Sequence, residues 1–268
     1  MVRVVTDSNT MIPAALAEAV GLIVVPLTVT IGGDELVEDG ALDVAAAYRR
    51  LRAGEPATTS APAPGLFATA YAECGDAPIV SVHIGAAYSG TINAAQLGAT
   101  VVGADVRVVD TGTASFLAGC CALAAAEAAQ TGADVDAVVA AAERVAAGVA
   151  SVFTIAELDR AASGGRLGLQ DVATSGTPVV AMSASSIAPV ATVHSADEAA
   201  AFMLGHVAAI EGPLRIGVGD ADAGPAVDDL EAQLRAALPD ADVIRYVVGP
   251  TVAAHAGMGT FGVVYHRR

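Results

Sequence analysis

Short β-branched runs alternate with helix-like segments through the first half of the chain, and this alternation constrains the fold more than any other feature. The runs 78–84 (PIVSVHI) and 106–110 (VRVVD) have the length of buried strands, and the alanine-rich segments 114–130 and 134–147 have the length of helices. Strands separated by helices are joined by crossover connections, which favour a mainly parallel sheet. The sequence therefore predicts an α/β fold for this half.

The pattern changes near Ser151. Closely spaced strand-like runs such as 177–183 and 186–193 follow, with fewer helices between them. That order is typical of an α+β domain with a mixed or antiparallel sheet. We place the boundary after residue 158, which gives an N-terminal α/β domain (1–158) and a smaller C-terminal α+β domain (159–268).

Charge and cysteine content exclude several classes of function. The chain has 29 acidic residues against 13 basic ones, all of them Arg, and a net charge of −16. Non-specific binding to nucleic acid or to an anionic membrane needs clustered basic residues, so neither is expected. The three cysteines have no metal-ligand spacing and are odd in number, which predicts free thiols in a reducing cytoplasm and neither a disulfide framework nor a zinc site. The longest uncharged stretches, 77–104 and 172–196, are broken by turn residues and predict no membrane-spanning helix.

The most informative motif is the run Tyr88-Ser89-Gly90-Thr91, which follows the predicted strand 78–84 and opens a helix. A helix that starts after a loop of small residues exposes backbone N–H groups at its positive end, so the motif is suited to a phosphate or a carboxylate. Two alternatives remain open. Ser89 is an ordinary N-cap, or it is a nucleophile, although its neighbours depart from the G-x-S-x-G pattern of hydrolases.

Two other segments carry hydroxyl groups. Residues 55–65 (EPATTSAPAPG) predict a rigid loop in which Thr58, Thr59 and Ser60 are restricted by flanking prolines. Asp7 and Ser8 follow the first strand, where the loops of a doubly wound sheet form the binding crevice. Capping of the next helix is the alternative role for this pair.

The five histidines differ in setting. His255 lies in a run of small residues that predicts a glycine-rich turn between two strands, where its ring stays accessible to an anion. We expect His83 to be buried inside a strand and His206 to lie on a helix. His194 and His266 are predicted to be surface residues.

Together these segments resemble the DegV family of fatty acid-binding proteins. The resemblance extends through nearly the whole chain in order. It rests on seven motifs: VVTDSN, VVPLTVTIGG, PATTSAPAPG, IVSVHIGAAYSGTINAAQ, VRVVDTGTAS, LDRAASGGRLG and GPTVAAHAGMGTFGVV. Seven motifs at the usual spacing of the family are a specific signal.

The resemblance implies a bacterial, cytoplasmic, lipid-binding carrier of two domains. It implies a long-chain fatty acid in an apolar tunnel between the domains, with the carboxylate held at positions that correspond to Thr59, Ser89 and His255. Family members present the acyl chain to a separate fatty acid kinase, which makes an acyl phosphate. They are not enzymes themselves and carry no cofactor, so no residue is expected to be catalytic.

Further residues near these three positions are expected to line the ligand pocket as secondary contacts: Ser60, Gly90, Thr91, Asp7 and Ser8. The expected contacts with a kinase are Arg166 and His194.

The chain departs from the family pattern in two places. The stretch after Gly168 is shorter than usual, and His194 stands where members commonly carry Arg, followed by Asp197 and Glu198.

Two other functions stay open from the residues alone. One is a serine hydrolase or acyltransferase that uses Ser89 with His255 and an acid such as Asp7 or Asp110. The other is a protein that binds a phosphorylated metabolite at the helix terminus near Ser89.

Overall fold

The computed structural model describes residues 1–157, 175–184 and 186–268. The chain forms two compact units, and one segment that lies within the sequence range of the first unit belongs to the second. The first unit consists of Met1–Leu42 and Ala57–Ala147, and the second of Asp43–Pro56 and Gly148–Arg268. Because the second unit also takes in Asp43–Pro56, the two contain nearly equal numbers of residues. The predicted boundary after residue 158 stays a prediction of the sequence.

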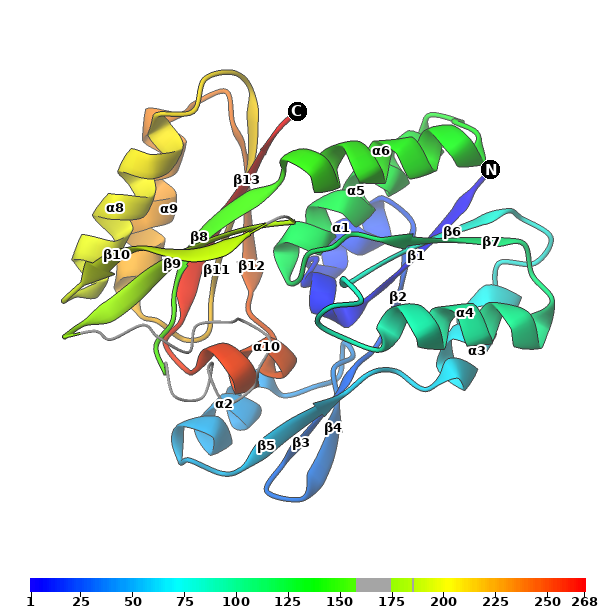
Figure 1. Cartoon of the computed structure of the whole chain (residues 1–268), viewed down its shortest axis with the longest axis horizontal. Helices are drawn as coiled ribbons and strands as arrows, with labels where there is room; N and C mark the ends of the chain where they lie inside the picture. The colour runs from blue at the N-terminus through cyan, green and yellow to red at the C-terminus, as the bar shows by residue number, and fades with distance from the viewer. Residues whose placement is uncertain (158–174, 185) are drawn as a thin grey trace. The chain divides into compact units, whose positions relative to one another are not determined.

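A four-stranded parallel sheet forms the centre of the first unit (Figure 1). Its strands, in spatial order, are β2 (Leu22–Val25), β1 (Arg3–Asp7), β6 (Ile79–His83) and β7 (Val106–Asp110). Every neighbouring pair is parallel, and all five residues of β6 are buried. Continuous apolar runs are expected of parallel strands because both of their faces are covered. This confirms the α/β fold predicted for the first half of the chain.

Helices cover both faces of this sheet. Figure 1 shows α3 and α4 on one side and α5 on the other. The helices of the unit are α1 (Ala14–Ala19), α3 (Pro64–Ala72), α4 (Thr91–Val102), α5 (Phe116–Gln130) and α6 (Val135–Gly148), with a 3₁₀ helix η1 (Ser8–Thr10) after β1. The helix α5 is buried over most of its surface, including Cys120 and Cys121, which are free thiols as predicted.

A small three-stranded antiparallel sheet completes the first unit, in the order β4 (Asp34–Val37), β3 (Thr28–Ile31), β5 (Ala57–Ser60). Pro26 separates β2 from β3. One expectation is wrong here. The predicted loop 55–65 contains the strand β5, since two β-branched threonines outweigh the flanking prolines.

The second unit is built on a six-stranded mixed sheet, as the sequence predicts. Among its described strands, only the pair β11–β12 is parallel. In spatial order the strands are β10 (Ile187–Val193), β9 (Thr177–Ser183), β8 (Ala150–Thr154), β13 (Phe261–Arg267), β11 (Leu214–Asp220) and β12 (Asp242–Val247).

The helices described in this unit are α2 (Val44–Arg52), α8 (Ala196–Ala208), α9 (Pro225–Ala237) and α10 (Pro250–Ala256). Side chains of α8 and α9 pack against alternate residues of the strands, such as Ile216 and Val263, and form the core of the unit. The carboxylate of Asp43 accepts a hydrogen bond from Ala46 N–H and caps α2.

None of the helices in the described part of the chain has the length and apolar character needed to cross a bilayer.

The helices α3 and α4 approach each other closely at Gly98. A Cβ atom at this position would lie 2.6 Å from Cβ of Phe67 and 2.8 Å from the carbonyl oxygen of Pro64. Phe67 is fully buried in the core that these helices share with β1 and β6. Any side chain at Gly98 must therefore push α3 away from α4.

We predict that Gly98→Ala lowers the free energy of unfolding by roughly 1–3 kcal/mol, the usual cost of overpacking. Gly205→Ala is the matched control, because Gly205 lies inside α8 and a Cβ atom there would have no neighbour within 4 Å. The control should be neutral or stabilising by up to about 1 kcal/mol, the difference in helix propensity. Urea unfolding followed by circular dichroism measures both. A midpoint for Gly98→Ala at or above the wild-type value contradicts the packing argument.

Candidate functional site

The parallel sheet has a switch point between β1 and β6. The chain runs from β1 outward to β2 and later returns to the other side of β1 to form β6 and then β7. The connections after β1 and β6 therefore leave the sheet in opposite directions. A crevice opens at the carboxyl ends of two such strands, and ligands of open α/β sheets bind there. This is the place where the sequence predicts the binding loops.

The loop after β1 is held by its own side chains. Asp7 Oδ1 accepts a hydrogen bond from Asn9 N–H at 3.0 Å, which caps η1. The hydroxyl of Ser8 donates to Glu38 Oε2 at 2.8 Å and accepts from Leu27 N–H at 2.9 Å. The capping role considered for Asp7 is thus present in the short 3₁₀ helix. The role of Asp7 and Ser8 as ligand contacts stays a prediction.

The turn that carries Ser89 follows β6. The carbonyl oxygen of Gly85 accepts hydrogen bonds from Tyr88 N–H at 2.9 Å and from Ser89 N–H at 3.3 Å. The Ser89 hydroxyl lies 2.8 Å from Thr91 Oγ1 and accepts from Thr91 N–H at 3.3 Å. Ser89 is half-buried, just before the 12-residue helix α4, whose N-cap is Gly90. The predicted strand, loop and helix are confirmed.

Thr59 and its neighbours point to opposite faces of β5. Thr59 pairs with Val29 on β3, and paired residues of antiparallel strands lie on the same face. Val29 is fully buried and Thr59 is half-buried, whereas Thr58 and Ser60 are exposed on the other face. Of the three consecutive hydroxyls, Thr59 therefore shares its face with buried apolar residues. Ser60 lies on the opposite, exposed face of β5.

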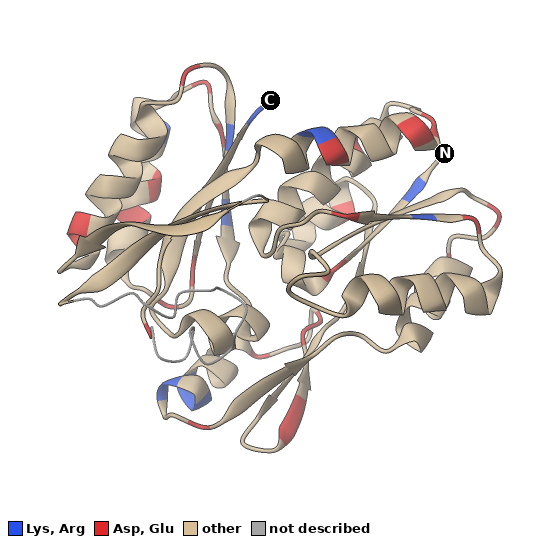
Figure 2. Ribbon diagram, in the orientation of Figure 1, with Lys and Arg blue, Asp and Glu red and all other residues tan. Residues whose placement is uncertain are grey.

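The two hydroxyl-bearing segments come together within the first unit. A Cβ atom at Gly90 would lie 3.8 Å from Cβ of Ala61, the residue directly after β5. The strand β5, which carries Thr59, thus ends beside the turn that carries Ser89. Residues 56–72 and 77–104, which contain both segments, have no charged side chain (Figure 2). The two segments themselves therefore offer hydroxyl and amide groups and no charged side chain.

The predicted third donor, His255, belongs to the second unit. Its predicted setting is wrong, because His255 lies in the last turn of the helix α10 and not in a glycine-rich turn. Pro250 at the first helical position is the signal that could have identified this helix. The helix ends at Ala256 and its C-cap is Gly257, which has a φ of 90°. The imidazole of His255 is half-buried.

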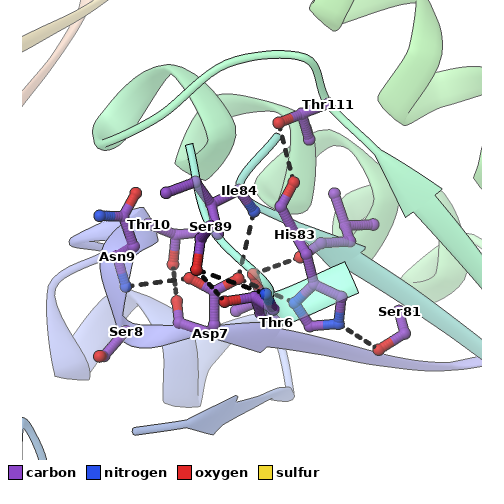
Figure 3. Close-up of polar contacts among 12 residues, drawn as sticks. Thr6, Asp7, Ser8, Asn9, Thr10, Ser81, His83, Ile84, Ser89 and Thr111 are labelled. Atoms are coloured by element: carbon purple, nitrogen blue, oxygen red, sulfur yellow. Dashed lines mark hydrogen bonds and ion pairs between the residues drawn. The ribbon is translucent and has the colours of Figure 1, made fainter. Parts of the chain in front are cut away.

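A buried polar chain, which the sequence does not reveal, lies beneath the loops. His83 Nδ1 is 2.8 Å from Asp7 Oδ2, His83 Nε2 is 2.6 Å from Ser81 Oγ, and Ser81 Oγ is 2.8 Å from Tyr71 Oη. Figure 3 shows His83 between Asp7 and Ser81. The order Ser–His–Asp matches the connectivity of a hydrolase triad. All three residues are 0% exposed, however, so a substrate does not reach Ser81.

Burial also controls the phenols and thiols near these loops. Desolvation raises the pKa of Tyr71 from its ordinary value of 10.0 to about 12. Burial likewise raises the pKa of Tyr88, which precedes Ser89, so its phenol keeps its proton at neutral pH. Burial raises the pKa of the Cys121 thiol to about 12. None of these groups supplies a nucleophilic anion at neutral pH.

The remaining candidates have the following outcomes. His83 is fully buried and His206 lies on α8, as predicted, and His194 is exposed as predicted. The prediction for His266 is wrong, because its side chain is 5% exposed within the central strand β13. Arg166 lies outside the described residues. Among the residues that the structure describes, no three His, Cys, Asp or Glu side chains gather as metal ligands.

The family model described as "Uncharacterised protein, DegV family" matches residues 1–268. A DegV domain-containing protein of Streptomyces coelicolor is 38% identical over 278 residues, covering 100% of this chain and 99% of that protein. Another, from Mycobacterium tuberculosis strain H37Rv, is 30% identical over 269 residues, covering 98% of this chain and 96% of that protein.

Solved structures share the fold over the full length. A DegV family protein from Thermus thermophilus, described for its fatty acid binding, has a TM-score of 0.89 and 28% identity, with 100% of this chain and 99% of that chain covered. The fatty acid-binding protein DegV from Bacillus subtilis has a TM-score of 0.87 and 24% identity over the same shares. The fold likeness agrees with the sequence match along the whole chain, and the chain belongs to the DegV family.

Proposed function

We propose that this protein binds one long-chain fatty acid, with the acyl chain in an apolar tunnel and the carboxylate held by hydrogen bonds from Thr59, Ser89 and His255. The observation that carries the ligand class is the full-length likeness to the Thermus thermophilus protein described for fatty acid binding. In this proposal the protein is a carrier and does not catalyse a reaction.

The geometry of the first unit supports a carboxylate. A buried carboxylate must accept hydrogen bonds, and hydroxyl groups are neutral donors that supply them. Thr59 and Ser89 offer such donors from uncharged segments that end side by side. A phosphate dianion would instead favour Arg side chains, which these segments lack. The acyl chain contributes roughly 0.8 kcal/mol for each buried CH₂ group.

The hydrolase alternative has less support. The Asp7 carboxylate is fully buried and already accepts hydrogen bonds from His83 and from the N–H groups of Asn9 and Ile84. The Asp110 carboxylate accepts from the N–H groups of Gly112 and Ala86. Both acids that could orient a histidine beside Ser89 thus have other partners.

We also propose that the loaded protein presents its ligand to a separate fatty acid kinase. The proposed contacts are Arg166 and His194. His194 is exposed at the end of β10, and its backbone N–H donates to Glu198 Oε2 at 2.7 Å. Glu198 and Asp197 place two negative charges beside this contact, in the first turn of α8.

Native mass spectrometry of the purified protein, followed by lipid extraction, tests the ligand class. We expect a bound acid with a long acyl chain at about one molecule per chain. If the protein purifies without ligand, palmitic acid added to it should bind at the same ratio. Failure to bind any fatty acid, in both experiments, refutes the carrier proposal.

Removing a donor should weaken binding of the carboxylate. Thr59→Val, Ser89→Ala and His255→Ala are each expected to cost roughly 1–3 kcal/mol in palmitic acid affinity, the usual effect of losing a buried hydrogen-bond partner. Thr58→Val is the matched control, because Thr58 is exposed on the opposite face of the same strand. Calorimetric titration measures the four dissociation constants. Unchanged affinity in the Thr59 or Ser89 variant would remove that residue from the site.

An added positive charge tests the kinase contact. His194→Arg should raise the rate of acyl phosphate formation by a bacterial fatty acid kinase at low salt, because it supplies the positive charge that family members commonly carry at this position. Thr192→Arg adds the same charge two residues earlier, at an exposed position inside β10, and should have a smaller effect. Both variants should bind palmitic acid as the wild type does. Equal rates for the two variants at low and high salt would contradict a contact at His194.

A further inference from the structure

Four buried side chains form a continuous polar chain that runs from α3 through β6 to the end of β1. Tyr71, Ser81, His83 and Asp7 are each at most 1% exposed. They are joined in that order by contacts of 2.8, 2.6 and 2.8 Å. Buried polar groups without a partner are costly, so an arrangement of this kind persists where every member is satisfied.

One proton arrangement satisfies the whole chain. A carboxylate only accepts hydrogen bonds, so His83 Nδ1 donates its proton to Asp7 Oδ2. With the imidazole neutral, Nε2 accepts from the hydroxyl of Ser81, and Ser81 accepts from the phenol of Tyr71. Each group in this chain donates its proton to the next group on the side of Asp7. The carboxylate of Asp7 is therefore the terminal acceptor of the chain.

Asp7 also joins two loops. Its Oδ1 accepts from Asn9 N–H at 3.0 Å in the loop after β1 (Figure 3). Its Oδ2 accepts from Ile84 N–H at 3.2 Å in the loop after β6, in addition to His83 Nδ1. Asp7 and His83 are the last residues of β1 and β6, the two strands that flank the switch point. One carboxylate thus fixes both sides of the crevice.

The loop after β6 transmits this constraint to Ser89. Ile84 is followed by Gly85, whose N–H donates to Thr113 O at 2.7 Å and whose carbonyl accepts from Ser89 N–H at 3.3 Å. A Cβ atom at Gly85 would lie 2.8 Å from the carbonyl carbon of Gly112, so the turn is packed against the loop after β7. Two consecutive amides, of Ile84 and Gly85, are therefore anchored directly before the turn that orients Ser89.

We propose that Asp7 and His83 are positioning residues for Ser89: the buried hydrogen bond between them fixes the turn 84–89, so that the Ser89 hydroxyl meets the carboxylate of the ligand. This inference rests on the proposed fatty acid site. It assigns Asp7 a role through the loop, without direct contact with the ligand. Preorganised donors bind more tightly because the loop loses less conformational freedom on binding.

Two variants of His83 distinguish its hydrogen bond to Asp7 from its hydrogen bond to Ser81. His83→Asn keeps an amide N–H close to the place of Nδ1 and retains the hydrogen bond to Asp7. His83→Leu has a similar volume and removes both hydrogen bonds of the ring. Tyr71→Phe is the matched structural control, since it removes a buried hydrogen bond of the same chain on the side away from the loop.

The ligands are palmitic acid and 1-hexadecanol, which has the same chain length but no carboxylate. We expect His83→Leu to weaken palmitic acid binding by about ten-fold, the effect of one lost buried hydrogen bond, and to change hexadecanol binding by less than about two-fold. His83→Asn and Tyr71→Phe should bind both ligands within about three-fold of the wild type. A residue that only stabilises the fold would not distinguish the acid from the alcohol.

A double-mutant cycle adds an independent readout. If His83 acts through Ser89, His83→Leu should have no further effect on palmitic acid binding in a Ser89→Ala background. Additive losses in the double variant, or equal losses for acid and alcohol, would overturn the positioning role. If His83→Leu does not fold, Asp7→Asn replaces it in both experiments. That variant keeps the size of the side chain but places an amide donor or a weaker acceptor against Ile84 N–H.

Titration of the wild-type protein with both ligands distinguishes a failure of the positioning role from a failure of the fatty acid site. A wild-type protein that binds neither ligand refutes the fatty acid site itself. A wild-type protein that loses affinity through Ser89→Ala but not through His83→Leu or Asp7→Asn keeps the fatty acid site and refutes only the positioning role.

Discussion

The buried carboxylate of Asp7 is the constraint on which the first unit depends. A fully buried carboxylate is tolerated only when donors surround it, and the structure supplies three from two strands and their loops. The donors from His83 and Ile84 lie 76 and 77 residues away in the sequence. The ends of β1 and β6 are consequently tied together where the sheet changes direction, and the hydroxyl-bearing turn starts from that fixed point.

Much of the fold can be predicted from local pattern. The alternation of apolar runs with alanine-rich segments indicates the parallel sheet because each run is long enough for a strand and each segment for a helix. The helix after Ser89 follows from the same order. The strand β5 is missed because prolines at 56 and 62 indicate a loop, and its pairing with Val29 is not local. The helix α10 is missed because a short helix of seven residues carries a weak periodic signal.

The candidate site is predicted less completely, for a physical reason. Ser89 is recognisable because its run of small residues lies between a predicted strand and a predicted helix, where backbone N–H groups are exposed, whereas Thr59 is singled out only by the resemblance to the family. The approach of their segments at Gly90 and Ala61 is not local, and the register of β5 against β3 decides that Thr59, and not Ser60, shares a face with buried Val29. The link between Asp7 and His83 joins residues far apart in sequence, and no property of either residue type identifies its partner. The uncharged character of both segments is visible in the sequence, and it favours an acid of single charge.

The segment Asp43–Pro56 lies within the sequence range of the first unit but belongs to the second. This limits how the chain can be cut into two fragments. Tyr48 of α2 donates its phenolic hydrogen to the carbonyl of Val248, at 2.6 Å and 200 residues away. The helix is encoded within the first half of the chain but completes the second unit. A cut between the two halves of the sequence would separate Tyr48 from Val248, and ribosomal synthesis must make α2 long before its partner exists. The second unit is therefore completed only after Val248 and the strand β13 have been synthesised.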